Sequence, residues 1–230
     1  LEMEGRFKEA SDPFAFLPGD AAIAGLPLEM SNWIRDRAID LGWTEDVDLI
    51  LSLPGIAEML LSDPCEDFTQ GVLPIQDDYI QLLGRLAGAR ILSLESPGEF
   101  LTDLTQDEDT ARAVIATYAA YLKPMRTNAE RTTAFALYLE GRMGVMEAWD
   151  HAFQRLVYGP PGRDTLRATD AYLLEFRNRR FVDRLSRDLA DGGVVIAVGA
   201  AHIPGNAGLV ALLRDSGYTV ERIPLSGEVP

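Results

Sequence analysis

The chain of 230 residues contains a single cysteine, Cys65, and no apolar run long enough to cross a bilayer. One thiol excludes an intramolecular disulfide and any metal cluster held by several cysteines. A helical membrane span needs about 18–20 consecutive apolar residues, and no stretch of the sequence reaches that length. The lack of a disulfide does not fix the compartment, because many exported proteins have none.

Basic residues are also scarce. The chain has 21 Lys and Arg against 36 Asp and Glu, a formal net charge of −15. Binding to nucleic acid requires a basic surface that neutralises phosphates, so this balance excludes a nucleic-acid partner. The same argument excludes docking on an anionic membrane surface. The charge favours solubility and indicates nothing more specific.

The length and the 47% hydrophobic content are sufficient for one globular domain with a buried core. Apolar runs predict strands at residues 89–95 and 193–199, and a more alternating run predicts a third at 218–224. Residues 1–4 read as the end of a fourth. We therefore predict a helix-rich α/β fold with a small central sheet, mostly parallel or mixed.

Most of the remaining chain has helical periodicity. The segment from about 100 to 160 reads as a helical insert, and Tyr158-Gly-Pro-Pro-Gly162 is the clearest break in the chain. Met143 and Met146 are predicted to lie in the core. The predicted helices cover residues 76–86, 107–123, one or two segments between 135 and 156, 165–189 and 207–216.

His202 is the strongest candidate for chemistry. It follows Gly199 by three residues, between the apolar run at 193–199 and a helix start. Gly199 allows a sharp turn or a close approach to a ligand. The helix start disfavours imidazolium, and a neutral ring can ligate a metal or act as a base. A histidine that only caps the helix is the alternative.

Glu95 ends the other apolar run, so its carboxylate is predicted to face the same crevice as His202. There it would act as a metal ligand, a general base or an orienting partner. The alternative is an exposed glutamate that leads into the turn Ser96-Pro97-Gly98.

Arg177 and Asn178 lie inside the predicted helix 165–189. Asn178 falls on the apolar stripe of that helix, so it is predicted to be buried and hydrogen-bonded. Arg177 is predicted to reach a carboxylate such as Glu95, or a substrate anion. Arg179 and Arg180 are predicted to lie on the solvated face.

His151, the second histidine, has no partner at metal-ligand spacing. We interpret it as structural.

Residues 194–220 resemble the C-terminal signature of the TraB/GumN family: an apolar strand, Gly-x-x-His, Pro-Gly, a helix ending at Gly-Tyr, and a last strand. Arg177-Asn178 resembles the Arg-Asn pair of the preceding helix in that family, and residues 91–95 resemble its strand closing on Leu-Glu. The likeness covers about residues 70–225. It implies one TraB/GumN-like domain over residues 1–230.

The resemblance also implies a function. The family includes the metal-dependent Tiki membrane proteases and pheromone-shutdown proteins implicated in peptide binding or degradation, and it is similar to haem-binding and erythromycin-esterase folds. We expect a metal-dependent, peptidase-like hydrolase with Glu95, His202, Arg177 and Asn178 in its site. His202 and Glu95 would ligate a divalent metal, and Gly199 would line the cofactor site. A non-catalytic protein that binds a peptide or cofactor in the same crevice is the alternative.

The chain departs from this family in one respect. The family has a first Gly-x-x-His on an N-terminal strand, and this chain contains no such motif. We expect the motif upstream of Leu1 or missing altogether, which weakens the case for metal binding by this chain. The expected ligand is a peptide or small molecule. The resemblance favours the cell envelope or periplasm, and a cytoplasmic location is the alternative.

Overall fold

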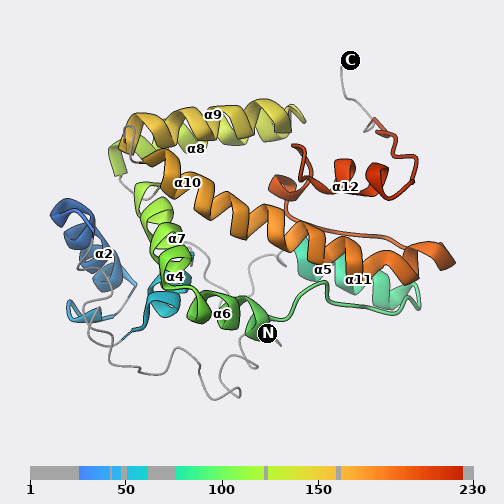
Figure 1. The fold of residues 1–230 in the computed structure, drawn as a ribbon, viewed down its shortest axis with the longest axis horizontal. Coiled ribbons are helices and arrows are strands. Elements are labelled where there is room, and N and C mark those ends of the chain that lie inside the picture. Colours follow the sequence, from blue (N-terminus) through green and yellow to red (C-terminus); the bar gives the residue numbers. More distant parts are fainter. Residues whose placement is uncertain are drawn as a thin grey trace.

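The computed structural model describes residues 26–41, 43–47, 51–61, 76–121, 124–158 and 162–224. Every regular element within these ranges is a helix (Figure 1). The elements in chain order are α2 (Leu28–Asp40), α4 (Leu53–Leu61), α5 (Gln76–Leu86), α6 (Pro97–Gln106), α7 (Glu108–Tyr121), α8 (Pro124–Leu139), α9 (Met143–Tyr158), α10 (Gly162–Asp170), the π-helical η2 (Ala171–Phe176), α11 (Arg177–Asp191), the 3₁₀ turn η3 (Ala200–His202) and α12 (Leu209–Asp215).

The predicted α/β fold with a central sheet is wrong for the described part of the chain. Residues 89–95 and 193–199 connect helices, and residues 218–224 follow α12. No backbone hydrogen bond joins any two of these segments. A strand is stable only when a neighbour accepts and donates along its ladder. Val195, predicted to be central and covered on both faces, is 89% exposed, and Ile223 is 85% exposed. The predicted strand at residues 1–4 lies outside the described residues.

The helix predictions fare better. The helix predicted at 76–86 is α5 with the same bounds, and α7 and α12 lie within the ranges predicted for them. The helix predicted at 165–189 is a continuous rod of α10, η2 and α11. One π-helical stretch interrupts this rod just before Arg177. Such stretches are rare and often lie at functional sites.

The hydrophobic core lies at one end of this rod, where α7 packs against α4 and α10 (Figure 1). Ile34 of α2, Ile56 of α4, and Val114 and Ile115 of α7 are fully buried there. Burying such a side chain contributes about 1.5–3 kcal/mol. The other end of the rod carries α12, so the core and the residues around His202 occupy different regions.

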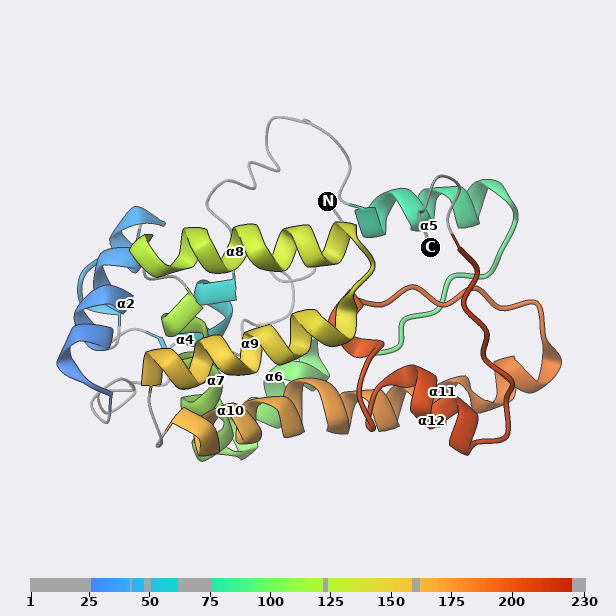
Figure 2. The same cartoon turned by 90° about the horizontal axis from the view of Figure 1, so that it is seen from above.

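Two helices within the predicted insert, α8 and α9, form an antiparallel pair, and α9 packs against α10 of the rod (Figure 2). α7 lies in the same predicted range but belongs to the hydrophobic core. The prediction that Met143 and Met146 are core residues is wrong, because both side chains are only partly buried. Both residues lie on α9, outside the hydrophobic core. None of the described helices is long and apolar enough to cross a membrane.

Local sequence explains how α6 begins. Ser96 caps the helix: its side chain accepts from the Glu99 amide, and the Glu99 carboxylate accepts from the Ser96 amide at 2.8 Å. Pro97 occupies the first helical position, where its missing N–H costs nothing. This capping box ends the extended segment 89–95 and fixes Glu95 one residue before the helix.

Candidate functional site

Glu95 is held by two arginines of α11. Arg177 donates to Glu95 Oε2 from Nε at 2.9 Å and from a terminal nitrogen at 2.8 Å. Arg180 donates to Glu95 Oε1. The Glu95 side chain is only 10% exposed. The predicted reach of Arg177 to Glu95 is therefore confirmed, and the exposed strand-end alternative for Glu95 is not what the structure shows.

The prediction that Arg180 lies on the solvated face is wrong. Its side chain is 17% exposed, and it also pairs with Asp103 of α6 at 2.9 Å. Arg179 is exposed, as predicted. Arg177 and Arg180 are three residues apart and so share one helix face, whereas Arg179 points away from it. The spacing was the available signal for Arg180, but α6 as its partner was not predictable from spacing alone.

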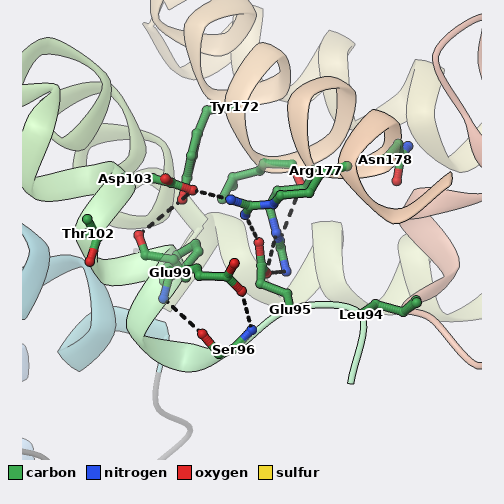
Figure 3. A network of polar contacts seen from close by, with 12 residues as sticks. Leu94, Glu95, Ser96, Glu99, Thr102, Asp103, Tyr172, Arg177 and Asn178 are labelled. Atoms are coloured by element: carbon green, nitrogen blue, oxygen red, sulfur yellow. Dashed lines mark hydrogen bonds and ion pairs between the residues drawn. The ribbon is translucent and has the colours of Figure 1, made fainter. Parts of the chain in front are cut away.

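A third arginine of the same face, Arg184, was also missed. It donates to the Leu94 carbonyl at 2.6 Å and pairs with Glu99. Figure 3 shows Glu95 below Arg177, with Ser96 and Glu99 beside it. The hydrogen bond from Arg184, together with the Ser96 amide of the capping box, lowers the pKa of Glu99 to about 2. The backbone on both sides of Glu95 is thus fixed between α6 and α11.

Asn178 is 1% exposed and hydrogen-bonded, as predicted from its place on the apolar stripe, and its partners lie in the loop that carries His202, which was not predicted. Its amide nitrogen donates to the carbonyls of His202 at 3.3 Å and Ala207 at 2.8 Å. These two bonds fix the orientation of the amide, because the opposite orientation would face its oxygen toward two carbonyl oxygens. The Asn178 oxygen therefore faces His202 Nδ1, 2.6 Å away.

This geometry sets the tautomer of His202. An amide oxygen only accepts, so Nδ1 must carry the proton and donate it. The lone pair then lies on Nε2, for which the described residues provide no hydrogen-bond partner. Burial and the Arg177 charge lower the pKa of His202 to about 4, against the opposing charge of Glu95. The predicted neutral ring is supported, although burial rather than the helix start is its main cause.

The low pKa of His202 predicts how stability changes with pH. The unfolded chain binds a proton near the ordinary value of 6.5, whereas the folded chain binds it only near 4. The folding stability that the neutral His202 contributes is therefore present above about pH 6.5 and is lost as pH falls toward about 4. In His202→Gln this loss should disappear. Denaturation midpoints of both proteins at pH 7 and pH 4.5 measure it, and an equal pH dependence would contradict the assignment.

Gly199 is close to His202. Of the two roles predicted for it, a sharp turn or a close approach to a ligand, its backbone does not require the first. Its φ of −56° and ψ of 142° are open to any residue. A Cβ at this position would lie 3.7 Å from Cδ2 of the His202 ring. Because Cδ2 is bonded to Nε2, Gly199 keeps the space on that side of the ring free of a side chain.

Glu95 and His202 belong to one neighbourhood. The His202 ring packs against the Phe181 ring, with 5.3 Å between the centroids. The Arg177 guanidinium carbon lies 5.6 Å from the centroid of the Phe181 ring. Arg177 in turn binds Glu95. The charges of Glu95 and Arg177 both act on the pKa of His202. α11 is thus the element that brings the two candidate residues together, since no sheet edge is described here.

His151 lies elsewhere, as predicted. Its Nε2 is 2.9 Å from Asp170, which ties α9 to α10. Burial raises the pKa of the Asp170 carboxyl above its ordinary value. This contact agrees with a structural role for His151.

A comparison with known proteins identifies the family of the chain. The model of the TraB/PrgY/gumN family matches residues 46–222, which include Glu95, Arg177, Asn178, Gly199 and His202. No curated protein and no solved structure matches the chain. A match over more than half of the chain shows that this protein belongs to the TraB/PrgY/gumN family.

Proposed function

We propose that this protein is a peptidase-like hydrolase in which His202 Nε2 meets the reacting atoms and a divalent metal assists. The observation that carries the proposal is the His202 tautomer. Asn178 uses the Nδ1 proton, which leaves the lone pair on Nε2, and the described residues provide no hydrogen-bond partner for that nitrogen. At neutral pH the low pKa keeps that lone pair unprotonated. A neutral imidazole in this state is a metal ligand or a hydrogen-bond acceptor.

The donor atoms of the site fit part of a metal shell. A carboxylate has about four acceptor positions. Arg177 occupies two on Oε2 and Arg180 one on Oε1, so one position on Glu95 Oε1 is left. His202 Nε2 and Glu95 Oε1 are thus the residues that would hold a divalent ion. The described residues include no group of three or more His, Cys, Asp or Glu that could hold one. When bound, the ion would polarise the scissile carbonyl and activate water.

The chain's own residues supply the preorganisation for this chemistry. Asn178 fixes the His202 ring, and partners that fix the tautomer and orientation of an imidazole also raise its basicity as a ligand. Arg177 and Arg180 fix the Glu95 carboxylate, which is only 10% exposed. The Arg177 charge also keeps His202 deprotonated. All of these side chains except Glu95 and His202 come from the rigid α11.

His202→Ala should abolish hydrolysis and leave the fold almost unchanged. The ring is only half-buried and packs on one aromatic side chain, so its loss should cost about 1 kcal/mol, as for a cap or a single hydrogen bond. Cleavage of fluorescently labelled casein is measured with Zn²⁺, Mn²⁺ or EDTA, alongside a melting curve. His151→Ala, which changes a histidine outside the site, is the matched control. A His202→Ala protein that still cleaves casein at the parent rate would show that the reacting site lies elsewhere.

The second candidate is a non-catalytic protein that binds a peptide in the same crevice. Two observations favour it: three of the four acceptor positions of Glu95 are occupied, and a histidine with a pKa of about 4 is a weak base at neutral pH. The casein assay separates the two. Saturable binding of labelled casein peptides that requires His202 and releases no cleavage product would favour the binding protein.

A further inference from the structure

One π-helical stretch, η2, interrupts the rod between α10 and α11. A π-helical turn takes one residue more than an α-helical turn, because its hydrogen bonds close i→i+5 instead of i→i+4. None of the 6 residues of η2 is buried. The residues that the rod buries lie before it on α10 and after it on α11. η2 therefore separates two buried faces and decides how one is rotated relative to the other.

The rotation follows from the residue numbers. Leu166 and Asn178 are twelve residues apart, as are Thr169 and Phe181, and all four side chains are buried. In an uninterrupted α-helix of about 3.6 residues per turn, this separation would place the members of each pair about 120° apart around the axis. One extra residue absorbed by the π-helical turn reduces the difference to about 20°. η2 thus brings the buried residues of α10 and α11 onto one face of the rod.

This shared face meets the elements that hold His202. On α10 it carries Thr169, whose hydroxyl shares a hydrogen bond with a threonine of α7. On α11 it carries Asn178, which binds the His202 loop. α9 packs against α10 and reaches the same loop, where a Cβ on Gly205 would lie 3.3 Å from Glu147 Oε1. Figure 1 shows α9 and α12 on the same side of the rod. The loop is therefore held from α11 and from α9 at once.

We infer that η2 is a positioning element for His202, because its one extra residue turns Asn178 toward the His202 loop while α10 stays packed on α7 and α9. The functional weight of this placement rests on the proposed function, whereas the geometry requires no ligand. In a plain α-helix with the same number of residues, Asn178 would point about 100° away from the loop. The Nδ1 proton of His202 would then have no fixed acceptor.

A deletion and an insertion at one position test the inference. Removing Glu175 takes out the extra residue, so the rod can close as an α-helix with both buried faces still aligned. Inserting one alanine after Glu175 instead rotates α11 by about 100°. In an ordinary α-helix the two changes would rotate α11 equally, in opposite directions, and would do equal harm. Glu175 suits the experiment because it is exposed and its ion pair with Arg179 is a surface pair of little weight. Glu175→Ala, which keeps the residue count, is the matched control.

Imidazole ¹⁵N shifts of His202 are the first readout, and casein cleavage is the second. The Glu175 deletion and Glu175→Ala should keep the Nδ1-protonated ring and unfold near the parent denaturant concentration. The insertion should lose the Nδ1-protonated ring and about 100-fold of the cleavage rate, the usual effect of misplacing a reacting group by about 1 Å.

Two results would overturn the inference: a Glu175 deletion that loses the Nδ1-protonated ring, or an insertion that retains it. If the insertion does not fold, the deletion still decides, because an ordinary α-helix would not tolerate it either. A parent protein that cleaves no casein would refute the proposed hydrolysis, and the ¹⁵N shifts would decide the role of η2 on their own.

Discussion

Asn178→Ala should lower the free energy of unfolding by about 3 kcal/mol, the upper end of the cost of leaving buried polar groups unpaired. The variant removes three hydrogen bonds at once. The carbonyls of His202 and Ala207 and the His202 Nδ1 proton would lose their partner, the fully buried Asn178 amide. Denaturant unfolding of the two proteins measures the difference.

The same variant should change the chemistry of His202. Without the Asn178 oxygen, Nδ1 is no longer the fixed proton donor, so the proton can move to Nε2 and the lone pair that faces the ligand is no longer assured. Imidazole ¹⁵N shifts report which nitrogen carries the proton. Arg179→Ala is the matched control, because Arg179 is the exposed neighbour on the same helix. An Asn178→Ala protein that unfolds at the parent midpoint and retains the Nδ1-protonated ring would contradict the site as described.

Asn178 shows what sequence patterns could predict here. A polar residue on an apolar helical stripe must find partners, so its burial and bonding follow from periodicity and desolvation cost alone. The helices follow for the same reason, since their signals are local. The capping box at Ser96 and Glu99 is equally local and was available as a signal for α6.

Local patterns could not show that the predicted strands remain unpaired, and they could not show the role of Arg180. A short apolar run has the composition of a buried strand, but pairing depends on a neighbour that is distant in sequence. Residues 193–199 have that composition, and the structure leaves Val195 exposed and unpaired. An arginine on a helix is usually solvated, so the sequence predicts that Arg180 is exposed. Its burial depends on its ion pair with Asp103 of α6, which is distant in sequence. Long-range partners decided both outcomes.

The site therefore depends on two non-helical segments that are held against one helix. Residues 94–96 are fixed by Arg177, Arg180 and Arg184 of α11, and the loop after His202 is fixed by Asn178 of the same helix. Neither segment is held by backbone hydrogen bonds to a neighbouring strand. A change in the His202 loop should consequently affect the site even where it touches neither Glu95 nor His202.

Gly208→Ala should be the most damaging change in that loop. A Cβ at residue 208 would lie 1.9 Å from the Pro204 carbonyl oxygen and 2.4 Å from that of Ile203. Both obstacles are backbone atoms, so no side chain can move aside. The turn between His202 and α12 must open, which should cost at least about 3 kcal/mol, the upper range for overpacking a tight site. It should also pull the His202 and Ala207 carbonyls away from Asn178.

Gly199→Ala is the control for Gly208→Ala, because its new Cβ would meet only ordinary van der Waals contact with the His202 ring. It should unfold at nearly the parent denaturant concentration. Gly208→Ala should unfold early and should lose the chemical shifts that mark the Nδ1-protonated ring, because the loop no longer presents His202 to Asn178. If Gly208→Ala matched Gly199→Ala in both measurements, the tight turn after His202 would not be what positions the imidazole.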